Sequence, residues 1–87
     1  MDEGRTRQQI RGFILKHFPL ARGRNIKNDD HLLEQGVIDS LGVLDIVAHL
    51  EQEFKIVVND EDLSPDNFRS IDQLTAFVLT KSDSGGE

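Results

Sequence analysis

Apolar residues recur at three- and four-residue steps in three stretches of the chain, which is the spacing of one face of a helix. The first stretch includes Ile10 and Ile14 and predicts an amphipathic helix from about residue 5 to residue 17. Pro19 ends this helix, because proline cannot continue a helix that is already in progress. No alternation of period two predicts a strand, since Ile56-Val57-Val58 is β-prone but short.

The strongest helical pattern begins at Asp39 or Ser40, either of which can accept hydrogen bonds from the free N–H groups of a first turn. Its apolar positions at helical spacing are Val43, Ile46, Val47, Leu50 and Phe54. A second apolar strip follows the other side of the same helix and consists of Leu41, Leu44 and Ala48. A small domain needs only one buried stripe, so the second strip is either exposed for a partner or covered because the helix is central.

A third helix is predicted near the C-terminus, where Ser70 and Gln73 fit a capping box. Its predicted buried face consists of Ile71, Leu74, Phe77 and Val78. Between the second and third helices, residues 59–67 suit a short or irregular helix. Lys81 lies near the C-terminal end of the last helix, where a positive charge is favourable. We expect residues 82–87 to form a flexible tail, because they are small and polar.

A long connection from Leu20 to Asp39 separates the first two helices and is rich in turn-forming residues. It also contains four large apolar residues that can pin it over a core: Leu32, Leu33, Val37 and Ile38. One helical turn is possible at Asp30–Gln35. We therefore predict an all-α four-helix bundle with three longer helices, one short helix and a long first loop, in one domain over residues 1–81.

The composition supports a small folded domain. The chain has 87 residues, of which 37% are hydrophobic and 30% are charged, so we expect a real but modest core. No apolar run approaches the roughly 20 residues that span a bilayer, and the basic start lacks the apolar stretch of a signal peptide. We expect a cytoplasmic monomer that does not insert into membranes.

The net charge of -6 is distributed unevenly. Residues 1–27 contain 7 Lys/Arg and 2 Asp/Glu, whereas residues 28–87 contain 3 and 14. The acidic part disfavours contact with nucleic acids and favours basic partner surfaces, which it attracts in a salt-dependent way. The alternative is that the acidic surface only keeps the protein in solution.

The chain contains no cysteine, which excludes thiolate metal sites and any thiol nucleophile of its own. Gly36 precedes Asp39 and Ser40 at the start of the strongest helix. There, unpaired N–H groups and the helix dipole favour a phosphate on the serine. Asp39 opposes such a phosphate, but it can bind a divalent ion or a basic group of a modifying enzyme. On its position alone, a serine at a helix start is most often only a cap.

Two segments resemble the core of acyl carrier proteins: Leu33–Leu41 (LEQGVIDSL), and Asp45–Phe54 (DIVAHLEQEF) followed by Ile56. The likeness extends from about residue 5 through residue 80. In that family the fold is a four-helix bundle, and the serine of Asp-Ser-Leu receives 4'-phosphopantetheine from coenzyme A. The resemblance implies that Ser40 is the attachment site, with Asp39 adjacent to it. It also implies that the chain has no catalytic activity and that the reactive thiol comes at the end of the arm.

In acyl carrier proteins the helix that starts at the serine is the main docking surface. The resemblance thus implies a partner-binding face that consists of Leu41, Leu44, Asp45, Ala48 and Glu51, with Glu53 as a further acidic contact. The implied partners are a phosphopantetheinyl transferase and acyl or aminoacyl ligases, transferases and synthases with basic docking surfaces.

The likeness to fatty-acid carriers is incomplete. Gly42 stands where those carriers usually have an acidic residue, and Lys55 replaces the acidic or glycine residue that usually follows the phenylalanine. His49 and Gln52 reduce the acidity of the helix face. We therefore expect a carrier of a specialised lipid or secondary-metabolite pathway, such as polyketide synthesis, rather than of general fatty acid biosynthesis. An aminoacyl, D-alanyl or peptidyl carrier is the alternative.

Three other functions were weighed against the carrier. An unmodified helical interaction module would share the fold. An esterase would need Ser40 activated by a histidine, and the Gly-x-Ser-x-Gly elbow is incomplete because Ile38 replaces its first glycine. Calcium binding is suggested by Asn28–Asp30 and Asn59–Asp62, but neither segment has alternate ligands closed by a glutamate. The histidines lack metal spacing, so we expect no metal site.

Overall fold

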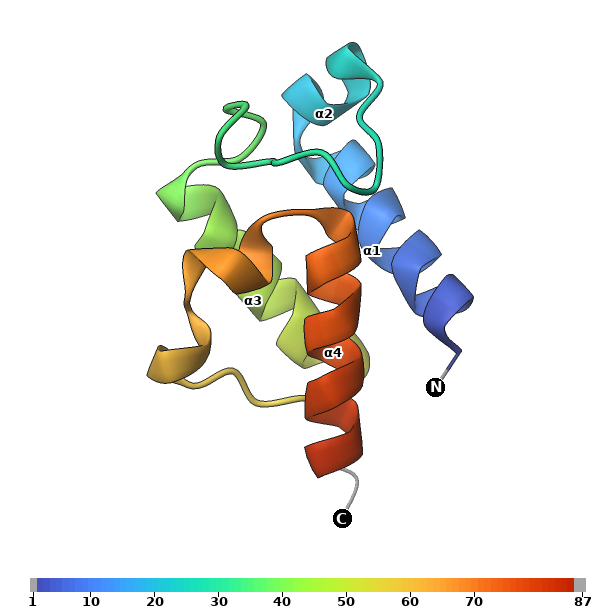
Figure 1. The fold of residues 1–87 in the computed structure, drawn as a ribbon, viewed down its shortest axis with the longest axis vertical. Coiled ribbons are helices and arrows are strands. Elements are labelled where there is room, and N and C mark those ends of the chain that lie inside the picture. The colour runs from blue at the N-terminus through green and yellow to red at the C-terminus, as the bar shows by residue number, and fades with distance from the viewer. Residues whose placement is uncertain (1, 86–87) are drawn as a thin grey trace.

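The computed structural model describes residues 2–85, with side chains through residue 82, and every regular element in that range is a helix. Three α-helices of 15 residues and one of 6 form the described domain, which confirms the predicted all-α four-helix bundle, although the short α-helix does not lie in residues 59–67, where a short helix was expected (Figure 1). In chain order the elements are α1 Glu3–His17, α2 Pro19–Arg24, α3 Ser40–Phe54, the 3-10 helices η1 Asp60–Asp62 and η2 Pro65–Phe68, and α4 Ile71–Gly85.

Helix α1 begins two residues earlier than the periodicity predicts. The Asp2 carboxylate accepts a hydrogen bond from the Gly4 N–H at 3.2 Å and so caps the first turn. Ile10 and Ile14 are buried as predicted, and they face α4. Arg7 forms ion pairs with Glu3 on its own helix and with Asp72 on α4, which joins the two helices at the surface.

The short helix α2 lies in the part of the chain after Pro19 where the sequence predicts only a connection. Pro19 does end α1, but it is also the first residue of α2. Proline is tolerated in the first helical turn, because its missing N–H would have no partner there. The turn between the two helices is at Phe18, whose backbone is extended. The predicted long loop is therefore shorter by the length of α2.

The loop between α2 and α3 is held over the core by buried side chains and by two backbone hydrogen bonds to the start of α4. The Leu32 N–H donates to the Arg69 carbonyl at 2.8 Å, and the Asp72 N–H donates to the Asn28 carbonyl at 2.9 Å. Of the four apolar residues predicted to hold the loop over the core, three are buried, namely Leu32, Val37 and Ile38. The fourth, Leu33, packs against the edge of the core. The predicted helical turn is present as one hydrogen-bonded turn from His31 to Gln35.

Helix α3 has the predicted length and the predicted buried face. Ile46, Leu50 and Phe54 are buried, while Val43 and Val47 pack against the core at its margin. It ends at Lys55, whose backbone is left-handed with φ 58°. This conformation is the usual helix stop, although glycine adopts it at lower cost than lysine.

The segment predicted as a short or irregular helix forms η1 and η2. Lys81 of α4 pairs with Asp62 of η1 at 2.7 Å, so its role is to fix η1 rather than to balance a helix end. A hydrogen bond from the Lys81 ammonium and a second one from the Asn59 N–H stabilise the ionised Asp62 carboxylate and lower its pKa.

Helix α4 is capped by Ser70, whose hydroxyl accepts a hydrogen bond from the Gln73 N–H at 3.1 Å, as the capping box predicts. All four residues of its predicted inner face are buried: Ile71, Leu74, Phe77 and Val78. The helix includes residues 82–85, which we expected to belong to a flexible tail, and residues 86 and 87 lie outside the described range. The domain boundary at residue 81 stays a prediction.

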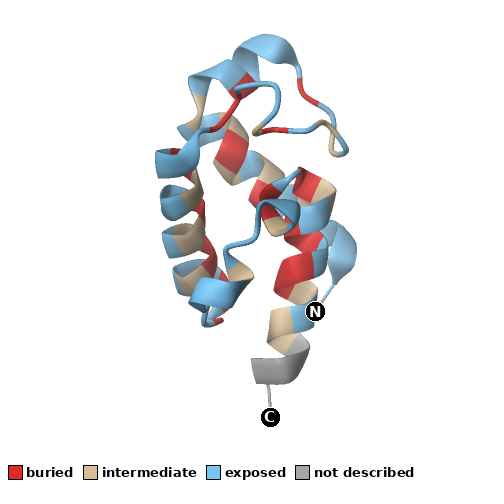
Figure 2. Ribbon diagram, turned by 60° about the vertical axis from the view of Figure 1, so that its left-hand side comes forward, coloured by how far each residue is buried: buried red, intermediate tan, exposed pale blue. Residues whose placement is uncertain are grey.

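The core lies where α1, α3 and α4 face one another, and the loop closes it at one end (Figures 1 and 2). In Figure 2 the buried positions form the facing sides of the long helices, and the outer sides are exposed. Ile14, Ile46, Leu50 and Val78 have no exposed surface, which marks the centre of this core. No helix in the described part of the chain is both long and apolar enough to cross a membrane.

Candidate functional site

Ser40 is the first residue of α3, and it is exposed. The cap of this helix is Asp39, whose Oδ1 accepts a hydrogen bond from the Gly42 N–H at 2.8 Å. The sequence left open which of the two residues caps the helix, and the structure assigns the cap to Asp39. The Ser40 hydroxyl is therefore not needed to stabilise the helix end, which leaves it available for modification.

Short-range hydrogen bonds and buried residues place Ser40 at the end of the loop. Gly36 has φ 73°, a left-handed conformation that turns the chain, and Val37 and Ile38 then enter the core. The Val37 N–H donates to the Leu32 carbonyl at 2.9 Å. The backbone just before Ser40 is therefore held by the core, and Ser40 is the point at which the chain reaches the surface.

An apolar groove of about 270 Å³ lies beside Ser40. Its wall includes Val43 and Leu44 from α3 and Phe68 from η2, and the remaining lining residues are Leu33, Leu63 and Pro65. Nothing in the sequence predicts that the segment after residue 59 lies close to the serine. The packing of η2 against α4 brings this segment there, and local periodicity carries no signal for such a contact.

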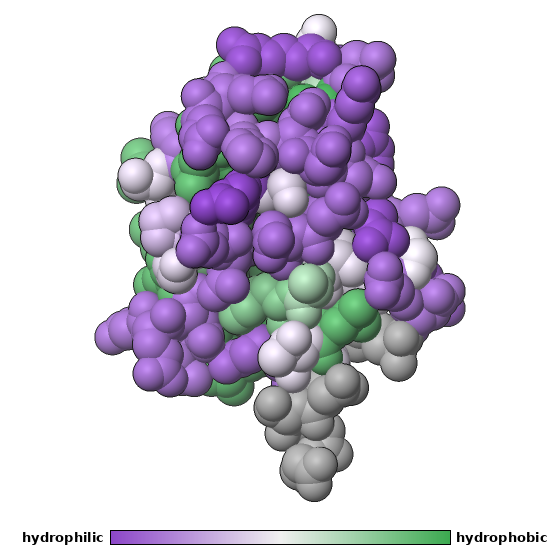
Figure 3. All heavy atoms as spheres, in the orientation of Figure 1, coloured by the Kyte–Doolittle hydropathy of each residue, from purple (hydrophilic) through white to green (hydrophobic). Residues whose placement is uncertain are grey.

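The second apolar strip of α3 is exposed, which decides between the two interpretations of the sequence. Leu41 is 72% exposed and Leu44 is 57% exposed, and Ala48 is also exposed. In Figure 3, hydrophobic atoms come to the surface along the left-hand edge, where α3 begins in Figure 1, whereas hydrophilic atoms cover the end formed by α2. Ser40 therefore stands at the end of an apolar surface strip.

The acidic residues of α3 differ in their surroundings. The Asp45 Oδ2 lies 3.3 Å from Nε2 of His17 on α1. Glu51 is half-buried, and its Oε2 accepts a hydrogen bond from the Val58 N–H at 3.0 Å, which holds the chain after α3. Glu53 is exposed and lines a separate cavity between α1 and α3. The predicted acidic contacts thus do not form one uniform row.

The packing around position 42 explains why a glycine stands there, which the sequence alone did not show. A Cβ atom at this position would lie 2.9 Å and 3.3 Å from Cε1 and Cζ of Phe18. The Phe18 ring is itself held at its edge by His17, with ring centroids 5.0 Å apart, and by Phe13 at 6.3 Å. Glycine allows the corner between α1 and α2 to pack directly on the first turn of α3.

Gly42→Ala is expected to destabilise the protein by about 1 kcal/mol, because overpacking outweighs the gain in helix propensity. In a Phe18→Ala background the same substitution is expected to stabilise by up to about 1 kcal/mol, since the obstructing ring is gone. A double-mutant cycle of urea unfolding measures the difference. Equal effects of Gly42→Ala in the two backgrounds would show that the Phe18 contact is not the reason for the glycine.

The three histidines are engaged away from Ser40. His31 pairs with Glu34 at 2.9 Å, His17 pairs with Asp45, and His49 stacks on Phe13. In the described part of the chain none of them is hydrogen-bonded to Ser40, so the geometry gives no support to an esterase.

Between positions 2 and 82, no three or more His, Cys, Asp or Glu residues form a group that could hold a metal ion. Asn59 and Asp62 instead form the capping box of η1.

Comparison with known proteins bears directly on this serine. Residues 16–78 match a family model described as a phosphopantetheine attachment site, and the match covers most of the chain, including Ser40 and all of α3. The chain belongs to this family. The family is the one for which the four-helix bundle was expected, and its prosthetic group is 4'-phosphopantetheine.

Curated relatives in this family are named as carriers. The mitochondrial acyl carrier protein of Neurospora crassa is 29% identical over 79 residues, which cover 91% of this chain and 54% of the relative. Aminoacyl carrier protein 2 of Bradyrhizobium diazoefficiens is 25% identical over 65 residues, 75% of this chain and 72% of the relative. "Probable acyl carrier protein PigG" of a Serratia species is 32% identical over 47 residues, 54% of each chain. The chain spans about half the length of two of these three relatives.

Proposed function

We propose that this protein carries acyl or aminoacyl groups as thioesters on a 4'-phosphopantetheine arm attached to Ser40, and that it catalyses no step itself. The observation that carries the proposal is the position of Ser40. It is an exposed serine at the start of a 15-residue helix, within the matched region, and its neighbour Asp39 caps that helix in its place. The names of the relatives support the carrier role.

The residues around Ser40 suit a phosphate-linked arm. The Asp39 carboxylate accepts the hydrogen bond of the Gly42 N–H. The N–H groups of Ser40 and Leu41, the first two residues of α3, have no partner within the helix. The positive end of the 15-residue helix dipole stabilises a phosphate there, against the repulsion of the Asp39 carboxylate. The arm supplies the thiol that a chain without cysteine lacks. The groove beside Ser40 offers apolar surface where the arm begins.

The decisive experiment measures intact mass after the apo protein is incubated with coenzyme A and a broad-specificity phosphopantetheinyl transferase. A gain of one arm that depends on Ser40 supports the carrier. The rival function, a helical interaction module that is never modified, requires that no mass be gained. A gain that persists without Ser40 would place the site elsewhere.

For the cargo, we propose a specialised pathway, with an acyl carrier of lipid or secondary metabolism favoured and an aminoacyl, D-alanyl or peptidyl carrier as the alternative. Gly42 supports a departure from ordinary fatty-acid carriers, because an acidic side chain at this position would meet the Phe18 ring. The relatives include both an acyl carrier protein and an aminoacyl carrier protein, so both classes of cargo stay in the proposal. The cytoplasmic location and the monomeric state remain predictions.

The partners that we propose are the transferase that attaches the arm and the ligases, transferases and synthases that load and use the cargo. Leu41, Leu44 and Ala48 supply the apolar part of the docking face, and Asp45 supplies an exposed charge. Glu51 is the weaker candidate for a direct contact, because its carboxylate already accepts the Val58 N–H.

Asp45→Lys is expected to lower kcat/KM for arm attachment about tenfold at low salt, because it replaces an attraction to a basic partner by a repulsion. Thermal unfolding is expected to change little, since Asp45 is exposed. Asp29→Lys is the matched control, because it makes the same change of net charge at an exposed position of the first loop. Equal losses in the two variants would mean that only net charge matters and that α3 is not an electrostatic docking face.

A further inference from the structure

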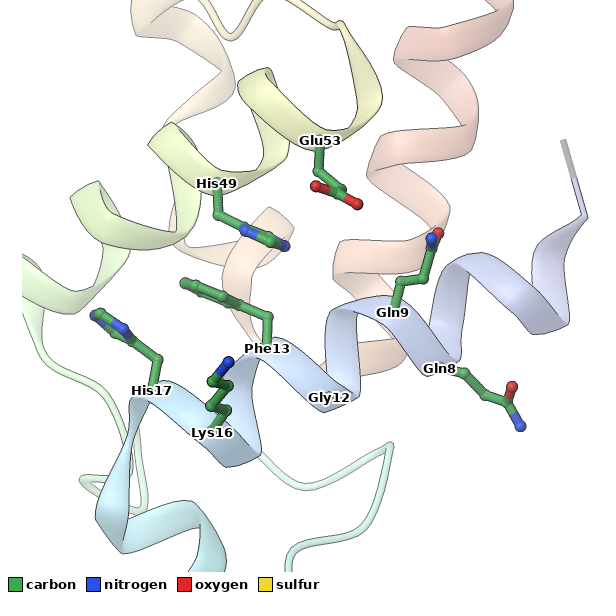
Figure 4. A pocket seen from close by; sticks show the side chains of 8 residues that line it. All are labelled: Gln8, Gln9, Gly12, Phe13, Lys16, His17, His49 and Glu53. Atoms are coloured by element: carbon green, nitrogen blue, oxygen red, sulfur yellow. The ribbon is translucent and has the colours of Figure 1, made fainter.

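One face of α3 is covered by the end of α1. Gly42, Asp45 and His49 follow one another along this face at steps of three and four residues. They meet Phe18, His17 and Phe13 in turn: the Phe18 ring lies over Gly42, His17 lies beside Asp45, and Phe13 stacks on His49 with ring centroids 3.8 Å apart. Figure 4 shows the His17, Phe13 and His49 rings together at one side of the cavity between the two helices.

The His17 imidazole is held in place by two aromatic rings. Its plane lies 15° from that of Phe13 with centroids 5.0 Å apart, and it meets Phe18 edge-on at the same centroid distance. Exposed ion pairs are usually weak in part because two long side chains must be ordered. Here the imidazole is already oriented, and its Nε2 points to the Asp45 carboxylate at 3.3 Å.

Asp45 therefore has two possible partners. Its side chain is 59% exposed, so a cation of a docking protein can reach it. The same carboxylate is within reach of His17, which attracts it most strongly when the imidazole is charged. A partner lysine or arginine must then compete with His17 for Asp45, and the competition grows as the imidazole gains a proton.

We propose that His17 competes with basic partners for Asp45 and thereby sets how strongly a partner can bind this carboxylate. Docking weakens on mild acidification because His17 takes the place of the partner's cation. The inference rests on the proposed carrier function and adds a specificity-determining residue to its docking face. It assigns to α1, which lies beside the expected docking helix, a direct part in partner choice.

Three other ionisable groups lie in the same cluster. On α1 the neighbour is Lys16, and on α3 the neighbours are His49 and Glu53. Burial against Phe13 lowers the pKa of His49; Glu53 opposes this shift, and His17 adds to it. His49 thus resists protonation. Histidine is the side chain that ordinarily gains charge between about pH 8 and pH 6.

The test compares the full-length apo protein with its His17→Phe variant, which keeps an aromatic ring between Phe13 and Phe18 but cannot be charged. Affinity for a phosphopantetheinyl transferase, without coenzyme A, is measured by calorimetry at low salt at about pH 8 and about pH 6. The enzyme's own titration affects both carriers equally, so it cancels in the ratio of the two affinities. From about pH 8 to about pH 6 we expect this ratio to shift about threefold in favour of His17→Phe.

Asp45→Asn provides the second arm of the test. In that background His17→Phe is expected to change the affinity at neither pH, because the contested carboxylate is gone. A pH-independent ratio, or an effect of His17→Phe that persists with Asp45→Asn, would overturn the inference and leave the carrier function intact. If the wild-type chain neither binds the transferase at about pH 8 nor gains an arm, both proposals fail. Thermal melts at both pH values verify that each variant is folded.

Discussion

Ser40→Ala is expected to abolish attachment of the arm while it leaves the free energy of unfolding within about 0.5 kcal/mol of wild type. The hydroxyl oxygen is the only nucleophile that the variant loses, and Asp39 rather than Ser40 caps α3. Intact mass after incubation with coenzyme A and the transferase measures the first effect, and urea unfolding measures the second. A variant that still gains one arm would contradict the assignment of Ser40.

The neighbouring residue supplies the matched control. Asp39→Ala removes the acceptor of the Gly42 N–H and is expected to destabilise by about 1 kcal/mol, a typical loss for a helix cap. Asp39→Asn keeps an acceptor oxygen and is expected to restore most of that stability. If Ser40→Ala were the destabilising variant and Asp39→Ala were silent, the division of roles between the two residues would be wrong.

Phe68→Ala is expected to cost about 3 to 5 kcal/mol, a large part of the roughly 5–15 kcal/mol that stabilises a small domain. Phe68 has no exposed surface, and its ring lies 6.0 Å from that of Phe77 on α4. It therefore attaches η2 to the last helix and closes the groove beside Ser40. Urea unfolding followed by far-UV circular dichroism is the appropriate measurement, since the chain has no tryptophan or tyrosine.

Two further substitutions distinguish packing from a specific role of the residue. Leu63→Ala alters the same groove at a position that is 38% exposed and is expected to cost about 1 kcal/mol or less. Phe68→Leu retains most of the buried volume and is expected to cost about half as much as Phe68→Ala. Equal effects of Leu63→Ala and Phe68→Ala would mean that η2 is not anchored through the aromatic ring.

The parts of the fold that sequence predicts well are those that depend on local spacing. The inner face of α4, with Ile71 and Val78, and the start of α3 at Ser40 follow from helical periodicity and capping residues. The apolar strip with Leu41 and Leu44 was recognised, although periodicity alone could not decide whether it is buried or exposed. Helix α2 was missed because Pro19 both ends one helix and begins the next.

The contacts that shape the site come from residues far apart in the chain. Phe18 over Gly42 and His17 beside Asp45 join α1 to α3, and Glu51 holds the Val58 backbone after the helix has ended. Each pairing depends on how the helices cross, which no local pattern encodes. For the same reason the family resemblance, which implies a contact between Glu51 and a partner, could not show that the Glu51 carboxylate accepts an internal hydrogen bond.

The hydrogen bonds that tie the first loop to the start of α4 have a consequence for how cargo travels. With Leu32 bonded to Arg69, and with Val37 and Ile38 in the core, the backbone ahead of Ser40 has little freedom to swing. If the protein is the carrier that we propose, delivery to a distant active site falls to the arm, whose extended reach is about 20 Å, and to rotation of the whole domain. In that case the length of the arm, rather than any movement of the backbone at Ser40, limits how deep a partner's active site can lie.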